Sequence, residues 1–114
     1  AALRSGDPVS AASNYSKALA ANPKNIDAVI GLGDVALSQG QYGPAITQLK
    51  KASKLAPRRA RIYTLLGEAY LNSGNAVAAE ASFKKALTLD PDDARARNGY
   101  NEAAGRLPPP TDDP

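Results

Sequence analysis

The side chains that could carry out chemistry are few, because the chain contains neither histidine nor cysteine. This composition leaves no ordinary zinc site, no Ser-His triad and no disulfide or thiol chemistry. The remaining candidates are three carboxylates, Asp34, Glu68 and Glu102, which follow one another at intervals of 34 residues. Two carboxylates can act as general acid and base, but in an open groove both should stay ionised. No nucleophile stands beside a base, so we expect no enzyme, no catalytic residue, no metal site and no cofactor.

A second charged feature is a basic segment over residues 50–61, which contains no acidic residue. It contributes a basic patch, which consists of Lys50, Lys51, Lys54, Arg58 and Arg59. Such residues commonly keep a surface soluble and complement the negative ends of helices. The alternatives are contact with RNA, with an anionic lipid surface, or with an acidic groove of another copy. The net charge is only +3 and no aromatic residue interleaves with the patch, which argues against nucleic acid.

The elements that must position these groups follow the same 34-residue period. Glycines and prolines recur with this period, at Gly6, Gly40 and Gly74 and at Pro23, Pro57 and Pro91. Between them, apolar residues recur every three or four positions, as they do on one face of a helix. The pattern predicts helices over residues 7–21, 25–38, 42–55, 60–72, 76–89 and 94–106. Glycine can end a helix in the left-handed conformation, and Asp92 or Asp93 can cap the last helix.

The spaced residues of these helical hairpins resemble the tetratricopeptide repeat. The family pattern places a large residue, Leu-Gly and an aromatic residue in the first helix, then a small residue, a large residue, alanine and proline. The last complete unit aligns with this pattern at Tyr63, Leu66, Gly67, Tyr70, Ala79, Phe83, Ala86 and Pro91. The unit before it aligns at Val29, Leu32, Gly33, Ala36, Ala45, Leu49, Ala52 and Pro57. In that unit Val29 and Ala36 are smaller than the residues that the family prefers.

The resemblance implies an all-α fold, a right-handed superhelix of stacked antiparallel helical hairpins. The helical repeat domain would cover residues 1–106, with a half repeat at 1–23, repeats at 24–57 and 58–91, and a capping helix at 92–106. The chain would then begin in the middle of a repeat, as a fragment of a longer protein. Residues 107–114 form a proline-rich tail, which we expect to be an extended linker or, alternatively, a ligand for an SH3 or WW domain.

The resemblance also implies a concave groove, lined by the first helix of each unit. The side chains expected to face a partner there are Asp27, Ile30, Asp34, Leu37, Arg61, Thr64, Glu68, Leu71, Arg95, Asn98 and Glu102. The three carboxylates would form an acidic column beside an apolar column of Leu37 and Leu71. These columns favour a partner peptide or helix that presents Lys or Arg next to apolar anchors. Alternatively, the acidic column is a solvated face that pairs locally with Arg61 and Arg95.

Some members of the family bind the acidic C-terminus of heat-shock chaperones through a clamp of Lys, Asn, Asn, Lys and Arg. The clamp positions correspond here to Ile30, Asp34, Leu65, Arg95 and Gly99. Only Arg95 has a suitable side chain, and Asp34 carries the wrong charge. We therefore expect no such clamp in this chain.

The favoured function is a non-catalytic protein–protein interaction scaffold that binds a peptide or helix in its groove. The alternative is a homo-oligomerisation module, in which the half repeat leaves Tyr15 and Leu19 uncovered and recruits another chain. A nucleic-acid or anionic-surface binder that acts through residues 50–61 is the third hypothesis. The chain has no apolar run of about 18 residues, so no membrane span is predicted. The compartment, cytoplasmic or periplasmic, stays open.

Overall fold

The computed structural model describes residues 8–107, and this part of the chain is built from helices alone. The helices are α1 (Pro8–Ala21), α2 (Ile26–Ser38), α3 (Tyr42–Leu55), α4 (Ala60–Asn72), α5 (Ala76–Leu89) and α6 (Ala94–Arg106). The predicted all-α fold is thus confirmed over these residues. Gly6, the start of the predicted half repeat and residues 108–114 of the predicted proline-rich tail (107–114) lie outside the described residues.

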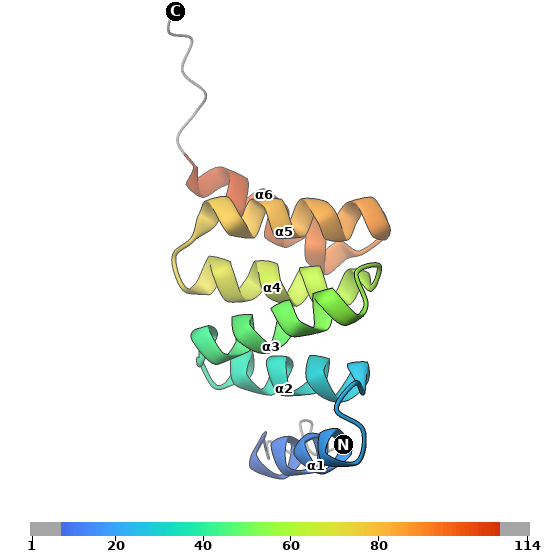
Figure 1. Ribbon diagram of the computed structural model, residues 1–114. Helices are drawn as coiled ribbons and strands as arrows, with labels where there is room; N and C mark the ends of the chain where they lie inside the picture. Colours follow the sequence, from blue (N-terminus) through green and yellow to red (C-terminus); the bar gives the residue numbers. More distant parts are fainter. Residues whose placement is uncertain (1–7, 108–114) are drawn as a thin grey trace, which may run out of the picture.

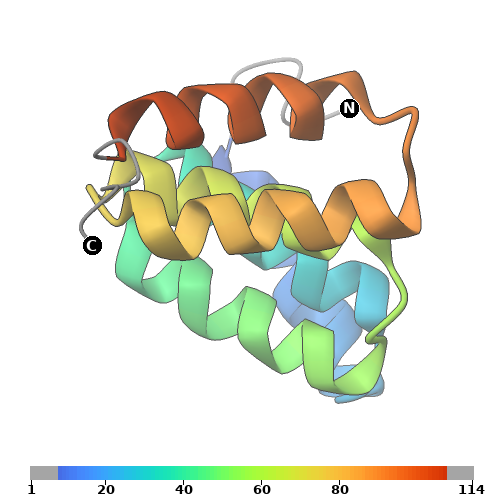
Figure 2. The same cartoon turned by 90° about the horizontal axis from the view of Figure 1, so that it is seen from above.

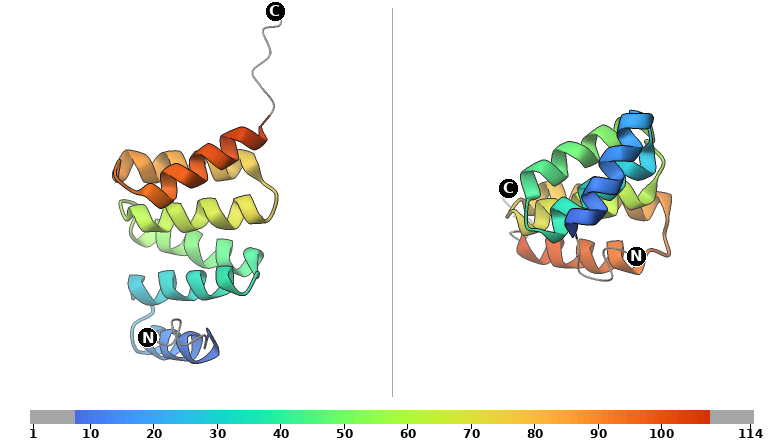
Figure 3. Two further views of the ribbon diagram at one scale, coloured as in Figure 1. Left: turned by 180° about the vertical axis from the view of Figure 1, so that it is seen from behind. Right: turned by 90° about the horizontal axis from the view of Figure 1, so that it is seen from below.

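The helices stack in chain order along one axis (Figure 1). Each helix packs against the next one, and α4 also contacts both α2 and α6. In contrast, among the described helices α1, α3 and α5 make no contact with one another. The side formed by α2, α4 and α6 is therefore the inner, concave side of the stack. In the views from above and from behind, α6 lies beside α5 and covers the end of the stack (Figures 2 and 3).

Two glycines end the first helix of their hairpins as the sequence predicted. Gly40 and Gly74 have φ values of 75° and 92°, in the left-handed region that favours glycine. The next residue then bonds back to the helix, with Gln41 N 2.8 Å from the Ala36 carbonyl oxygen. Asn75 N makes the same bond in the following hairpin. These bonds are those of a Schellman motif, which satisfies carbonyl groups at the end of the helix.

Side-chain caps define where three of the helices begin. Asn25 was predicted to start a helix, but its backbone is extended and its Oδ1 accepts a hydrogen bond from Ala28 N at 3.1 Å. It is therefore the N-cap, and α2 begins one residue later than predicted. Asn75 caps α5 in the same way, and Asp93 rather than Asp92 caps α6. Each cap satisfies a backbone N–H group that has no partner within the helix.

Phe83 of α5 is the largest fully buried side chain, with no exposed surface. Its ring lies between Gly67 of α4 and Gly99 of α6, because a Cβ atom placed on either glycine would overlap the ring. One aromatic side chain thereby holds three helices together. The sequence assigned Phe83 to packing, but it did not show that Gly99 also accommodates the ring.

The positions equivalent to Phe83 in the other second helices carry different residues, and the facing residue differs in size accordingly. In α1, Tyr15 stands against Gly31 of α2, as Phe83 stands against a glycine of α6. In α3 the residue is the smaller Leu49, and the next first helix carries Leu65 where the others carry glycine. Both leucines are fully buried. A large residue thus faces glycine and a medium residue faces leucine, which keeps the interior filled.

Candidate functional site

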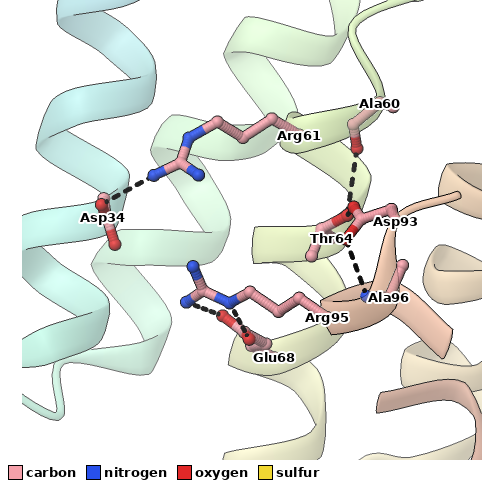
Figure 4. A network of polar contacts seen from close by, with 8 residues as sticks. All are labelled: Asp34, Ala60, Arg61, Thr64, Glu68, Asp93, Arg95 and Ala96. Carbon is pink, nitrogen blue, oxygen red and sulfur yellow. Dashed lines mark hydrogen bonds and ion pairs between the residues drawn. The ribbon is translucent and has the colours of Figure 1, made fainter. Parts of the chain in front are cut away.

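The carboxylates of the acidic column lie on the concave side, and arginines from the next first helix reach two of them (Figure 4). Arg61 Nη2 of α4 lies 3.1 Å from Asp34 Oδ2 of α2. Arg95 of α6 donates through Nε and Nη2 to both carboxylate oxygens of Glu68 of α4. Both pairs join residues 27 apart, so one contact repeats along the stack. We call these two ion pairs the ladder.

The arginines form the outer edge of the ladder and the carboxylates form its inner edge. The side chains of Arg61 and Arg95 are 55% and 50% exposed, whereas those of Asp34 and Glu68 are only 23% and 21% exposed. The hydrogen bonds to Glu68 raise the pKa of Arg95 above its ordinary value, although partial burial opposes this. A molecule that approaches the concave side therefore meets guanidinium groups first.

Two further ion pairs flank the ladder. Arg106 Nη2 lies 2.9 Å from Glu102 Oε2 within α6, and Arg106 Nη1 also donates to the carbonyl oxygen of Leu71 at 3.2 Å. At the other end, Arg59 Nη2 lies 2.5 Å from Asp27 Oδ1. The acidic column therefore does not present free negative charge, because an arginine accompanies each of its members.

A buried polar contact fixes α6 against α4 beside the ladder (Figure 4). Thr64, which is only 3% exposed, donates through Oγ1 to Asp93 Oδ2 at 2.7 Å. The other carboxylate oxygen accepts from Ala96 N at 3.1 Å and so caps α6. Burial by itself would raise the pKa of Asp93, but these hydrogen bonds and the positive charge of Arg95 outweigh it, and the pKa is lowered. Asp93 is thus held in its ionised form.

Replacing Asp93 with alanine should lower the free energy of unfolding at neutral pH by about 1–2 kcal/mol, because both the cap and the Thr64 contact are lost. The pKa of Asp93 is lower in the folded chain than its ordinary value of 3.8. Its contribution is therefore fully present above that value and is lost as the pH falls through the folded pKa. Urea unfolding, followed by circular dichroism at neutral and acidic pH, should show the difference between variant and parent shrink on acidification.

Asp92→Ala is the matched control, because Asp92 is adjacent and exposed and does not cap the helix. It should change the free energy of unfolding by less than about 0.5 kcal/mol. Equal losses in the two variants would contradict the role given to Asp93.

The sequence of the chain matches the model of a known protein family. A sequence model described as the tetratricopeptide repeat matches residues 2–69 and, about one unit later, residues 36–101. The two matches together span most of the chain. The chain belongs to the tetratricopeptide repeat family. A search of the curated proteins finds no match.

Solved structures share the tetratricopeptide repeat fold. The first such domain of Spaghetti (RPAP3), bound to the HSP90 peptide SRMEEVD, superposes with a TM-score of 0.87 at 18% identity, covering 91% of this chain and 82% of that chain. A mutant O-GlcNAc transferase of Thermobaculum terrenum has a TM-score of 0.86 at 34% identity, covering 90% of this chain and 20% of that chain. MamA has a TM-score of 0.82 at 28% identity, covering 91% and 61%. The chain thus spans a fifth of the transferase.

Three residues that were predicted to face a partner are instead buried in the tetratricopeptide array. Ile30, Thr64 and Leu71 are only 5%, 3% and 6% exposed. The first helices of neighbouring repeats lie in contact on the concave side, so side chains that point there pack against the next helix. Leu37 is half-buried against the same core, so the expected apolar column is largely covered. The predicted groove residues that keep accessible surface are Asp27, Asp34, Leu37, Arg61, Glu68, Arg95, Asn98 and Glu102.

All five residues of the basic patch are exposed, on α3 and the turn after it. Four of them, Lys50, Lys51, Lys54 and Arg58, have no ion-pair partner within residues 8–107. Arg59 is different, because it pairs with Asp27 at the start of the concave side. Arg59 is thus an exposed member of the patch whose charge is paired across to α2.

The sequence interpretation missed the Thr64–Asp93 contact, whose partners are 29 residues apart. No local pattern marks such a contact. The ladder corresponds to the alternative given in the sequence analysis, in which the acidic column pairs locally with Arg61 and Arg95. The equal spacing of 27 residues in Asp34–Arg61 and Glu68–Arg95 is the sequence signal for it.

The described residues offer neither a metal site nor a membrane-spanning helix. Within residues 8–107, no group of three or more acidic, histidine or cysteine side chains could hold a metal ion. No helix in this range is long and apolar enough to cross a membrane. The ladder is therefore the leading candidate for a functional surface.

Proposed function

We propose that this chain is a non-catalytic scaffold that holds a peptide or helix of a partner protein along its concave side. The observation that carries this proposal is the ladder, which presents charged side chains at one register on successive first helices. Two structures of the same fold support it, since one RPAP3 domain is bound to an HSP90 peptide and another is in complex with an HSP70 peptide.

The exposed arginines indicate how the partner is held. A guanidinium group has five N–H donors, and a carboxylate occupies at most two of them. The remaining donors of Arg61 and Arg95 suit carbonyl oxygens of an extended peptide. Because each arginine stands beside a carboxylate, the ladder carries no net charge and favours a partner that is not strongly charged. We therefore propose that Arg61 and Arg95, rather than the carboxylates, make the main polar contacts with the partner, and we call this contact led by the arginines.

A partner that presents Lys or Arg next to apolar anchors is the alternative. To bind it, Asp34 and Glu68 would have to exchange their own arginines for those of the partner. The two binding modes predict opposite effects of the same substitution on affinity. Removing Arg95 weakens contact led by the arginines, whereas it exposes Glu68 and strengthens contact led by the carboxylates.

A library of short displayed peptides should be selected against the chain, and the selected peptides should be titrated by fluorescence anisotropy. Arg95→Gln should weaken their binding by about tenfold, the loss expected for a charge-assisted hydrogen bond. Lys84→Gln is the matched control on the exposed surface of α5 and should leave affinity unchanged. Tighter binding by Arg95→Gln with weaker binding by Glu68→Gln would establish the carboxylate-led mode. Unchanged affinity in all three variants would refute a concave binding site.

The acidic peptide SRMEEVD should bind this chain with a dissociation constant above about 1 mM. Of the five clamp positions only Arg95 carries a suitable side chain, and Ile30 and Leu65 are buried. Carboxylates of the ladder would also repel the peptide. Titration by isothermal calorimetry checks this, with the C-terminally amidated peptide as the control. Binding well below this limit that is lost on amidation would show that a chaperone clamp exists.

Self-association through the N-terminal half repeat and binding of an anionic surface through the basic patch stay predictions. Sedimentation velocity at increasing concentration tests the first, since a monomer throughout would count against it. Filter binding of RNA at low and at physiological salt tests the second, because nonspecific phosphate contacts weaken steeply with salt.

A further inference from the structure

Unpaired lysines lie on the side of the stack opposite the ladder. Lys17, Lys51 and Lys85 follow one another at intervals of 34 residues, so they occupy the same position on α1, α3 and α5. All three are exposed, and none has an ion-pair partner within residues 8–107. We call them the lysine column. Because the three second helices make no contact with one another, the column lies on the outer, convex side of the stack.

Further cations surround the lysine column on α3, on the turn after it and on α5. They are exposed and also lack an ion-pair partner in the described part of the chain, and they are Lys50, Lys54, Arg58 and Lys84. The pair Lys50 and Lys84 is again 34 residues apart, so the arrangement repeats from one hairpin to the next. On α5, Glu80 lies one turn before Lys84, but α3 contains no acidic residue. The outer side is therefore basic, whereas the ladder on the concave side carries no net charge.

Apolar groups lie among these cations. Leu55 and Val77, the two large hydrophobic side chains that are exposed within residues 8–107, both belong to second helices and are 38% and 68% exposed. A shallow hollow of about 390 Å³ on α5 is lined by Ala81, Lys84, Lys85, Thr88 and Leu89. At its edge Lys85 is held in place, because its Nζ atom lies 5.2 Å from the centre of the Tyr63 ring. The outer side is thus basic and apolar at once.

The residue types of this surface decide between the anionic partners. All four ion pairs within residues 8–107 use arginine, whose planar fork matches a carboxylate, whereas lysine is a point charge without a fixed geometry. A fluid layer of lipid phosphate groups requires no fixed geometry. Apolar side chains among the lysines can enter the boundary of the acyl chains, but they add nothing to contact with the phosphate backbone of RNA. The aromatic side chains of the described range are all at least partly buried, which leaves RNA bases little to stack on.

We propose that the outer side of this chain binds the surface of an anionic lipid bilayer, with the lysine column and its neighbouring cations on the phosphate groups and Leu55 at the boundary of the acyl chains. The aliphatic stems of the lysines lie along apolar surface while their ammonium groups reach the headgroups. Clusters of about four to eight basic residues bind anionic lipid in this way. This inference goes beyond the proposed function, because it leaves the concave side free for a partner protein.

Cosedimentation with vesicles tests the charge contact. Vesicles of phosphatidylserine and phosphatidylcholine in equal amounts should bind the chain, and vesicles of phosphatidylcholine alone should not. Lys51→Gln should weaken binding by about fivefold, and replacing the whole lysine column with glutamine by about a hundredfold, since each lysine near an anionic bilayer contributes about this factor. Arg97→Gln is the matched control, because it removes the same charge from an exposed position on α6. Equal losses in Lys51→Gln and Arg97→Gln would overturn the proposal, because binding would then follow net charge alone.

A tryptophan reporter tests the apolar contact, because the chain has no tryptophan of its own. The fluorescence of Leu55→Trp should shift to shorter wavelength on the anionic vesicles and should be quenched by brominated lipid. Asn101→Trp places the same reporter at an exposed position on α6 and should show neither change. An unshifted spectrum of Leu55→Trp would overturn the proposal. So would tighter binding of single-stranded RNA than of the vesicles with the same loss in Lys51→Gln, which would assign the outer side to nucleic acid.

Discussion

Replacing Phe83 with alanine should lower the free energy of unfolding by about 3–5 kcal/mol, the largest loss that we expect from one substitution in this chain. The ring has no exposed surface and lies between Gly67 and Gly99, neither of which has a side chain that could move into the space. The cavity would therefore open toward α4 and α6 together. Denaturation in guanidinium chloride, followed by circular dichroism, measures the loss.

Val77→Ala is the matched control on the same helix, since Val77 is 68% exposed. It should change the free energy of unfolding by less than about 0.5 kcal/mol. Folded domains are commonly stable by only about 5–15 kcal/mol, so the Phe83 variant should lose a large share of its total stability. A loss below about 1 kcal/mol would show that α4 and α6 close around the missing ring.

Gly67→Ala should lower the free energy of unfolding by about 1–3 kcal/mol, although alanine is the better helix former. A Cβ atom at residue 67 would lie 2.6 Å from the ring of Phe83. The ring has little room to shift, because it is fully buried and Gly99 of α6 also lies against it. Overpacking thus outweighs the gain of about 1 kcal/mol that alanine normally brings inside a helix. The same denaturation experiment measures the effect.

Gly43→Ala is the control for Gly67→Ala and should show no overpacking. No atom beyond its chain neighbours and its own helix backbone lies within 4 Å of a Cβ placed there. This variant should change the free energy of unfolding by less than about 1 kcal/mol, because Pro44 disfavours the helical conformation of an alanine before it and so offsets the helix preference of alanine. Combining Gly67→Ala with Phe83→Leu tests the mechanism, since a smaller residue at 83 relieves the overlap and the two losses should not add. Additive losses, or a stabilised Gly67→Ala variant, would contradict the proposed contact.

The helices were predictable because their signals are local. Gly40 and Gly74 can adopt positive φ values, and Asn25 and Asp93 cap through backbone groups only three residues away. Apolar residues at helical spacing show which face packs, whatever the neighbour. The one-residue difference at Asn25 reflects the similarity between a cap and a first helical residue in sequence.

The candidate site was predictable only in part. The 34-residue period placed one carboxylate of the acidic column on each of α2, α4 and α6. It left open whether Arg61 and Arg95 pair with Asp34 and Glu68, and it could not show that the arginines lie outside the carboxylates. Which partner of an ion pair is outermost depends on side-chain length and on the offset between two helices, and neither is a property of a single segment.

A hollow between α1, α2 and α3 is lined by Ala12, Ala36 and Gln48 among others. The sequence signalled it only through Ala36, a departure from the family pattern. A small residue at that position could equally have been compensated by a larger neighbour, as Leu65 compensates for Leu49 elsewhere in the array. Only the packed arrangement shows that Ala12 leaves the volume open and that Gln48 lines it. The consequence of a substitution in the core depends on all the elements around it.

By itself, the sequence determined the helix order, the repeat length and the family, because these depend on turn residues and spacings that act over a few positions. Only the tertiary structure decided that Ile30, Thr64 and Leu71 are buried, that the acidic column is paired, and that the volume beside Ala36 is open. Each of these outcomes depends on atoms brought together from separate helices.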